Sequence, residues 1–255
     1  MDGHRIPGTR IAQTSAVLLA AATAWTVLIE LGVTAGAEPT ADSTHVEDYL
    51  ERFYAWTSAS LPQERGAFAL LCLGLVGVLV TAVRPAVEAP RLRSVLAAIG
   101  IAGGAALWAV AGVAEAGAQR AVEQMAAAET PIDPVNTVAY TVDVATGWLY
   151  AGACLALSAG FVIAVPLQPT VQRRVFAGLI AADASLFAVL VLTQIGTSEY
   201  AALALGGVLL PAWIAWSWLD PRTAVDPSQG PQDQPREHRA TGSATSDRAD
   251  VAVTG

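Results

Sequence analysis

Residues 138–165 decide the fold, and their sequence reads VAYTVDVATGWLYAGACLALSAGFVIAV. One charged side chain, Asp143, interrupts an apolar run that is longer than the roughly 20 residues a helix needs to cross a bilayer core. In lipid, a helix satisfies its own backbone hydrogen bonds, which a single extended segment does not. This stretch therefore predicts a transmembrane helix.

Five further segments have the same character, at about residues 11–33, 66–83, 94–118, 175–196 and 200–219. The composition of the whole chain agrees, because 54% of its 255 residues are hydrophobic and only 14% are charged. The sequence therefore predicts an all-α fold. We expect a polytopic integral membrane protein in which residues 1–219 form a six-transmembrane-helix bundle.

Arginines are distributed unevenly beside these spans. One side of the predicted membrane has eight of them: Arg5, Arg10, Arg84, Arg91, Arg93, Arg173, Arg174 and Arg222. The other side has three arginines and ten acidic residues. Cytoplasmic flanks of membrane helices are enriched in basic residues. We therefore expect a cytoplasmic membrane protein with both termini in the cytoplasm.

The first span raises the question of cleavage, because the small residues Ala35-Gly36-Ala37 follow it as in a signal-peptidase site. Its apolar run from Ile11 to Leu31 is longer than the roughly 7 to 15 residues typical of a signal peptide. We expect the first helix to remain uncleaved. Cleavage would leave five spans without changing the orientation of the rest.

Two segments outside the spans have distinct compositions. The predicted external loop covers residues 38–65. In it, a capping-box pattern and apolar residues at helical spacing predict a short amphipathic helix over 45–57. This helix would be either a lid on the bundle or a receptor or substrate-gating surface. Residues 220–255 are rich in Pro, Gly, Ser, Asp and Gln, which predicts a disordered cytoplasmic tail. Partner binding is the alternative for the tail.

Small and aromatic residues suggest how the helices end and pack. The pairs Gly32/Gly36 and Gly100/Gly104 have the spacing of close helix contacts within a bundle. Pro211 should kink the sixth span. The final span also has three tryptophans that we expect to form an interfacial belt: Trp213, Trp216 and Trp218.

Several kinds of chemistry are excluded or disfavoured. Lysine is absent, so no Schiff base can hold retinal or pyridoxal phosphate. The histidines lie outside the spans, and the two cysteines, Cys72 and Cys154, have no CxxC spacing, so we expect no cofactor and no metal. The net charge of −8, without a basic cluster, disfavours nucleic acid as a partner.

Four carboxylates lie within or at the edges of the spans: Glu30, Glu115, Asp143 and Asp183. Ionisable groups in hydrocarbon are costly and are functional candidates for that reason. Asp183 lies about 13 Å along the helix from Arg174, near the middle of the bilayer. Asp143 lies one to two turns inside its span, whereas Glu30 and Glu115 lie at helix ends where hydration alone could explain them.

Helical spacing places these acids on polar faces. The face on the fourth span consists of Asn136, Tyr140, Asp143, Gly147, Tyr150 and Cys154. The other three faces are Asp183, Phe187, Leu190 and Gln194; Thr23, Thr26 and Glu30; and Gly104, Trp108, Ala111 and Glu115. We predict a polar interior that includes Asp183, Asp143, Glu115, Glu30, Gln194 and Tyr150.

No arginine lies within the predicted spans, so each acid must be protonated, hydrated or beside a bound cation. The leading hypothesis is a protein that handles protons, cations or a small solute. Alternatively, the acids are ordinary interhelical ties of about 0.6 kcal/mol each, in a non-transporting scaffold or sensor subunit that acts through protein contacts. An intramembrane enzyme ranks third, because the spans contain no Ser-His or Ser-Lys pair. The lipid bilayer is the one expected partner; the sequence identifies no protein partner.

Overall fold

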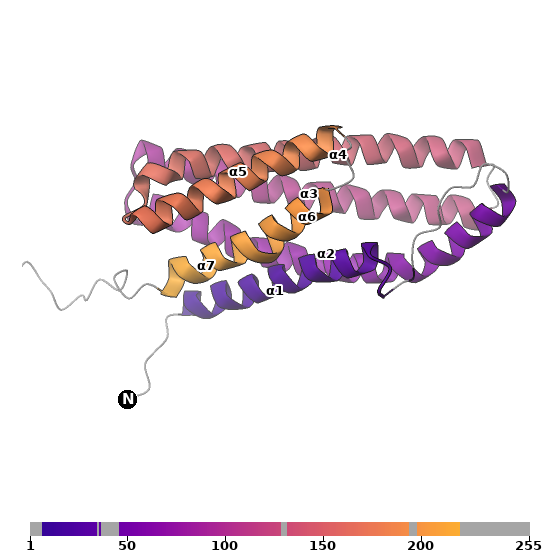
Figure 1. The fold of residues 1–255 in the computed structure, drawn as a ribbon, viewed down its shortest axis with the longest axis horizontal. Helices are drawn as coiled ribbons and strands as arrows, with labels where there is room; N and C mark the ends of the chain where they lie inside the picture. Colours follow the sequence, from indigo (N-terminus) through magenta and orange to yellow (C-terminus); the bar gives the residue numbers. More distant parts are fainter. Residues whose placement is uncertain (1–6, 35, 37–45, 129–131, 194–197, 220–255) are drawn as a thin grey trace, which may run out of the picture. The chain divides into compact units, whose positions relative to one another are not determined.

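The computed structural model describes residues 7–34, 36, 46–128, 132–193 and 198–219, and within these ranges the protein is all-helical (Figure 1). The predicted tail, residues 220–255, lies outside the described residues. The long helices are α1 (Pro7–Glu30), α2 (Val46–Glu88), α3 (Leu92–Ala127), α4 (Ile132–Ala164) and α5 (Val171–Thr193). The shorter elements are the 3-10 turn η1 (Val165–Leu167), α6 (Ser198–Ala202), the π-helical segment η2 (Leu203–Leu209) and α7 (Leu210–Leu219).

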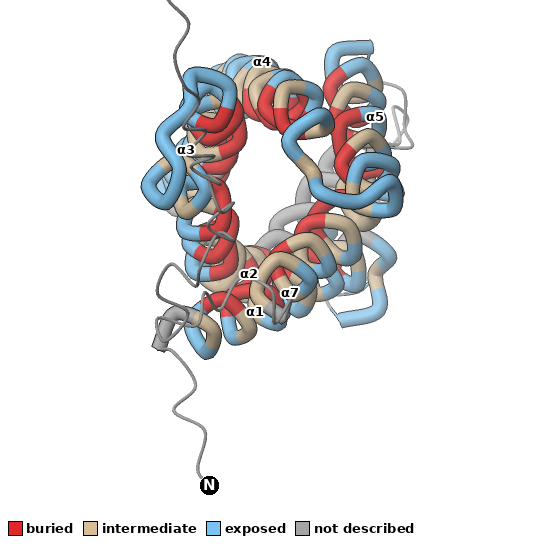
Figure 2. The backbone as a smooth tube through the Cα atoms, turned by 90° about the vertical axis from the view of Figure 1, so that its left-hand side faces the viewer, coloured by how far each residue is buried: buried red, intermediate tan, exposed pale blue. Residues whose placement is uncertain are grey.

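Among the described residues, six helical stretches are long and apolar enough to cross a membrane: Thr9–Ile29, Ala59–Glu88, Leu92–Ala121, Tyr140–Leu167, Val171–Thr193 and Tyr200–Trp218. The sixth stretch combines parts of α6, η2 and α7. Figure 2 shows buried residues on the sides of the helices that face one another and exposed residues on the outside. Many of the exposed residues are large and apolar, such as Val17, Ile99 and Val162 at 67%, 63% and 58% exposure. An apolar outer surface suits lipid, and the chain is a multi-pass membrane protein.

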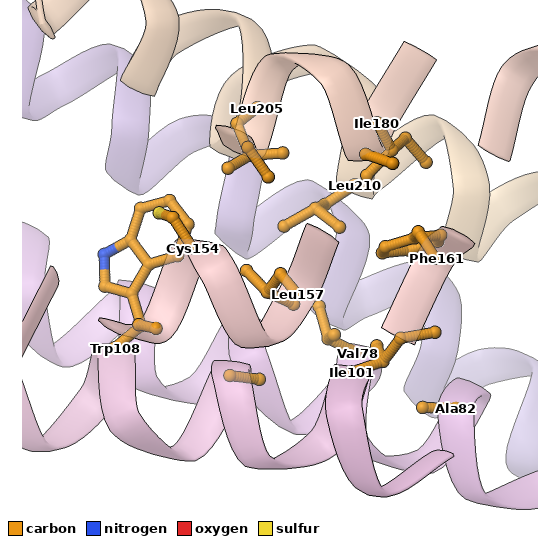
Figure 3. Close-up of a cluster of buried hydrophobic side chains, with 14 of the residues drawn as sticks. Val78, Ala82, Ile101, Trp108, Cys154, Leu157, Phe161, Ile180, Leu205 and Leu210 are labelled. Atoms are coloured by element: carbon orange, nitrogen blue, oxygen red, sulfur yellow. The ribbon is translucent and has the colours of Figure 1, made fainter. Parts of the chain in front are cut away.

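The buried core joins most of the helices. Its largest fully buried side chains include Phe161 and Leu157 of α4, Ile180 of α5, Leu205 of η2 and Leu210 of α7 (Figure 3). Glycines bring α3 and α4 close together: a Cβ atom at Gly100 would lie 2.7 Å from the Cα atom of Gly160, and one at Gly104 would lie 2.8 Å from the Leu157 nitrogen. The close packing expected for Gly100 and Gly104 is confirmed.

The other glycine pair has a different role. Gly32 and Gly36 have φ angles of 70° and 82°, beyond the last residue of α1. The Gly32 amide donates to the Ile29 carbonyl and the Val33 amide donates to the Leu28 carbonyl, both at 2.9 Å. This pair of bonds is a Schellman motif, which requires the left-handed conformation that glycine adopts without strain. The helix-packing interpretation of Gly32 and Gly36 was therefore wrong.

Helix α2 differs most from the expected organisation. Instead of a short helix over 45–57, a loop and then a span, one helix of 43 residues runs from Val46 to Glu88 and contains Pro62. Proline removes one backbone donor but does not always end a helix. Gln63 supports this region, because its Nε2 atom donates to the carbonyls of Ala59 and Thr34, both at 3.3 Å. Residues 38–45 of the predicted loop lie outside the described residues.

The interruption of the sixth span comes just before Pro211. The Leu210 amide donates to the Leu205 carbonyl, five residues earlier, at the end of η2. Pro211 has no amide hydrogen to donate, so the widened turn ends directly before the residue that cannot continue the helical bonding. Within η2, Gly206 packs against α1, because a Cβ atom there would lie 2.7 Å from Thr23 Oγ1.

Candidate functional site

The structure describes the side chains of three predicted site residues, Glu115, Tyr150 and Asp183. Glu30 is the last residue of α1 and Asp143 belongs to α4, but their side chains are not described. Gln194 lies outside the described residues. The described site residues and the polar side chains near them lie on α2, α3, α4 and α5.

Glu115 and Tyr150 connect α3 to α4. The Tyr150 hydroxyl donates a hydrogen bond of 2.7 Å to Glu115 Oε2. One turn farther along α3, Gln119 Nε2 donates to Glu64 Oε2 of α2, also at 2.7 Å. The sequence interpretation placed Glu64 in a loop and missed this pair. The spacing of Glu115 and Gln119, four residues apart, indicates that they share one face of α3, but it does not indicate that Gln119 meets Glu64.

Trp108 lies two turns from Glu115 on the same helix and is only 5% exposed. Its ring centroid is 6.4 Å from that of Tyr150, edge to face at 84°, and 5.8 Å from that of Phe187 of α5, tilted by 39°. Aromatic pairs favour such offset and edge-on arrangements. Together these three rings, Trp108, Tyr150 and Phe187, form an aromatic layer across α3, α4 and α5.

Asp183 and Cys154 are each one helical turn from this layer along their own helices, and Figure 3 shows the Cys154 side chain beside the Trp108 indole. Cys154 is four residues after Tyr150 on α4 and is fully buried. Asp183 is four residues before Phe187 on α5, is half-buried, and lies within electrostatic range of Cys154. Its Oδ2 atom is buried and accepts no hydrogen bond from any residue that the structure describes. A buried carboxyl oxygen without a donor is rare in proteins.

Polar contacts continue past Asp183. Ser158 Oγ donates to the Ala181 carbonyl at 2.9 Å and lies 2.7 Å from Ser185 Oγ, which also bonds to Ala181 at 3.0 Å. Neither serine was predicted as a site residue. Ser158 follows Cys154 by four residues, so the polar face of α4 extends one turn farther than predicted.

Two parts of the predicted faces do not point inward. Tyr140, ten residues before Tyr150 on α4, is 67% exposed, and Thr26 of α1 is also exposed. Tyr140 lies about 15 Å along the helix from Tyr150, near the start of the apolar stretch. The inward polar face of α4 is therefore described from Thr146, 3% exposed, to Ser158.

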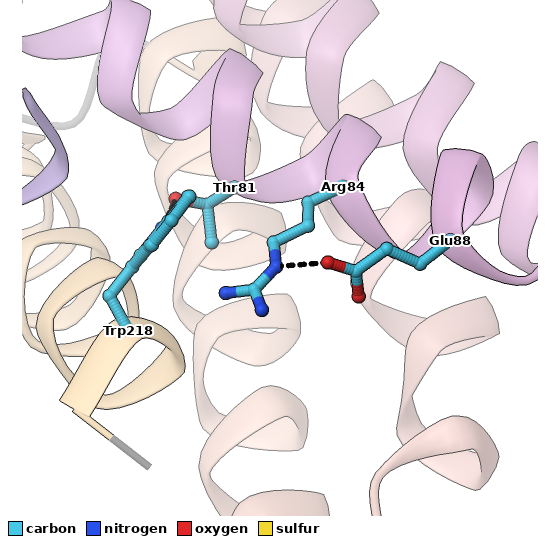
Figure 4. Close-up of polar contacts among 4 residues, drawn as sticks. All are labelled: Thr81, Arg84, Glu88 and Trp218. Atoms are coloured by element: carbon cyan, nitrogen blue, oxygen red, sulfur yellow. Dashed lines mark hydrogen bonds and ion pairs between the residues drawn. The ribbon is translucent and has the colours of Figure 1, made fainter. Parts of the chain in front are cut away.

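Arginines and tryptophans meet where α2 and α7 end and α5 begins, here called the Arg-rich end. Trp218 Nε1 donates to Thr81 Oγ1 at 2.9 Å, Arg84 lies 4.5 Å above the Trp218 ring, and Arg84 Nε is 2.6 Å from Glu88 Oε1 (Figure 4). Arg173 similarly lies 5.5 Å from the Trp216 ring and donates to the Trp216 carbonyl at 3.2 Å. Cation–π pairs of this kind hold arginines against an aromatic surface.

Within the described ranges, no three His, Cys, Asp or Glu side chains come together as a metal site would require.

The six apolar helices define a multi-pass helical membrane protein, and its interior has a half-buried acid near an aromatic layer. Comparisons of this chain with protein-family models, curated proteins and solved structures give no significant match.

Proposed function

We propose that this protein handles protons, or a small cation or solute, through its polar interior, with Asp183 as the group that takes up the proton or cation. The observation that carries the proposal is the buried Oδ2 atom of Asp183, which accepts no hydrogen bond within the described part of the chain. A carboxylate in an apolar bundle is costly unless a proton or a cation neutralises it. Such a group is suited to reversible binding.

The surroundings of Asp183 support this role. The nearest arginine along α5, Arg174, is nine residues away, about 13 Å along the helix. A permanent ion pair with that arginine is therefore out of reach within one helix. The neighbour on α4 is Cys154, whose thiol is only a weak hydrogen-bond donor.

Polar groups on both sides of Asp183 provide the elements of a pathway. Toward the end opposite the Arg-rich end lie the pairs Tyr150–Glu115 and Gln119–Glu64, each joined at 2.7 Å. Toward the Arg-rich end lies the pair Ser158–Ser185, also at 2.7 Å. Proton relays in membrane proteins use such series of carboxyl and hydroxyl groups.

We also propose that the protein lies in the cytoplasmic membrane with the Arg-rich end and both termini on the cytoplasmic side. The positive-inside tendency supports this orientation. So does the packing of Arg84 and Arg173 on tryptophan rings, since tryptophans favour the membrane–water interface.

Flux measurements in liposomes test the proposed function. Purified protein in phosphatidylethanolamine and phosphatidylglycerol vesicles is given a pH gradient, and then a sodium or potassium gradient, and flux is followed with internal dyes. We expect Asp183→Asn to reduce flux about ten-fold or more, because asparagine keeps the size of the side chain but does not titrate. Glu88→Gln, an exposed carboxylate at the Arg-rich end, is the matched control and should retain flux.

Wild-type protein that passes none of these ions faster than empty vesicles would contradict the proposal.

The second candidate function is a scaffold or sensor subunit, and the lengths of three helices favour it. Helices α2, α3 and α4 have 43, 36 and 33 residues, and so measure about 65, 54 and 50 Å against a core of about 30 Å. All three extend past α1, α5 and α6 at the end opposite the Arg-rich end (Figure 1), where a protein partner could bind.

A further inference from the structure

We propose that Trp108 closes the polar interior between Glu115 and Asp183 and acts as its gate. The inference rests on the proposed function in one respect, namely that the two acids belong to one pathway. It adds the residue that separates the two halves of that pathway.

The helix directions fix the depth of each residue. Helix α4 runs toward the Arg-rich end, so Cys154 lies one turn closer to that end than Tyr150 does. Helix α5 runs away from the Arg-rich end, so Asp183 lies one turn closer to it than Phe187 does. Trp108 contacts both Tyr150 and Phe187, and Figure 3 shows its indole beside the Cys154 side chain, so the ring lies where the aromatic layer meets the turn that carries Cys154.

Glu115 lies on the other side of Trp108. Helix α3 runs away from the Arg-rich end, and Glu115 follows Trp108 by seven residues, or about 10 Å along the axis. The Tyr150 hydroxyl reaches up to Glu115 while the Tyr150 ring contacts Trp108. Tyr150 thus touches both the acid and the indole, and along α3 the indole lies between that acid and the Arg-rich end.

The packing around Trp108 is closed. The indole is 5% exposed and Phe187 is 7% exposed, and neighbouring Ala105 and Ala111 on α3 are fully buried. Large apolar rings in contact leave little room for water, and apolar constrictions close pathways by excluding water. Rotation of one aromatic side chain is enough to reopen such a constriction, which is why we assign the gate to a single residue.

The second buried aromatic pair does not have this position. Phe161 and Trp213 pack at 5.0 Å and 78° between α4 and α7. Phe161 lies seven residues beyond Cys154, toward the Arg-rich end, so it is not between Glu115 and Asp183. Phe161 is fully buried, and Phe161→Ala removes a comparable aromatic ring at a different depth, which makes it the matched control.

The buried thiol of Cys154 provides the test. In a Cys72→Ala background, a membrane-impermeant cationic methanethiosulfonate is added to spheroplasts or to inside-out vesicles, and modification of Cys154 is timed by mass spectrometry. A separate Gln124→Cys variant in a Cys-free background marks the side opposite the Arg-rich end, because Gln124 is exposed near the end of α3.

We expect slow modification of Cys154 in the wild-type gate and about ten-fold faster modification in Trp108→Ala, only from the side on which Gln124→Cys reacts. Trp108→Phe should give a smaller acceleration, and it keeps the proposal testable if Trp108→Ala does not fold. Phe161→Ala should not accelerate modification from that side.

Unchanged rates in both Trp108 variants, acceleration from the Arg-rich side, or an equal effect of Phe161→Ala would overturn the gate. The measurement follows reagent access and not ion flux. Loss of the proposed function, shown by flux that does not depend on Asp183, is therefore distinguishable from loss of the gate.

Discussion

Charged side chains are treated in opposite ways at the Arg-rich end and in the polar interior. At the Arg-rich end, Arg84 contacts both Glu88 at 2.6 Å and the Trp218 ring at 4.5 Å. In the interior, the buried Oδ2 atom of Asp183 accepts no hydrogen bond among the described residues. The paired arginine is suited to anchoring a helix end, whereas the unpaired acid is suited to binding and releasing an ion. Both regions contain tryptophan, so the presence of a tryptophan is not what distinguishes them.

The largest expected effect is an all-or-none difference in sidedness between the two ends. In a Cys-free background, Ser228→Cys, in the segment that follows the Arg-rich end, should react with an impermeant maleimide only in inside-out vesicles. Ser43→Cys, between the first two helices, should react only in spheroplasts. The opposite pattern would reverse the orientation and place the end opposite the Arg-rich end in the cytoplasm.

The next largest effect is expected where α3 and α4 pack closely and support the polar interior. Gly100→Val should destabilise the bundle by about 2 to 3 kcal/mol, because the added carbons overlap the Gly160 backbone. Gly103→Val is the control, since a Cβ atom at Gly103 meets nothing within 4 Å. Free energies of unfolding in detergent and denaturant measure both. Equal losses would mean that helix propensity, and not the close contact, dominates.

Within the interior, Tyr150→Phe removes only the hydroxyl that donates to Glu115. We expect a loss of about 1 kcal/mol in stability, typical of one hydrogen bond at a partly buried site. Tyr200→Phe changes a tyrosine that is 68% exposed and should be neutral. If Tyr150→Phe were also neutral, the hydrogen bond to Glu115 would contribute nothing to stability. The contrast between Glu115, which accepts a hydrogen bond, and Asp183, whose Oδ2 atom accepts none among the described residues, would then weaken.

The smallest effect is expected at the Arg-rich end. Arg84→Gln breaks an ion pair and a cation–π contact at a partly exposed site, which together should contribute about 0.5 to 1 kcal/mol. Thermal unfolding in low and in high salt would show it, because added salt screens such pairs. A loss larger than that of Gly100→Val would mean that the Arg-rich end holds the bundle together.

Much of the candidate site follows from helical periodicity. Trp108, Ala111 and Glu115 share one face of α3, and the structure buries the first two and connects the third to Tyr150. Periodicity shows which residues share a face but not which face of another helix they meet. The contact between Gln119 and Glu64 joins residues 55 positions apart, and no local pattern indicates it.

The sequence by itself determined the class of the protein. Six apolar stretches must be helical in lipid, because no other single segment satisfies its backbone there, so length and composition were enough. The tertiary structure decided what depends on neighbours. Pro62 stays within α2, a π-helical segment precedes Pro211, and Gly32 ends α1, although the spacing of Gly32 and Gly36 suggested a helix contact. Only packing decided which helices bring Trp108, Tyr150 and Asp183 into one region, since contacts between helices depend on side chains far apart in the chain.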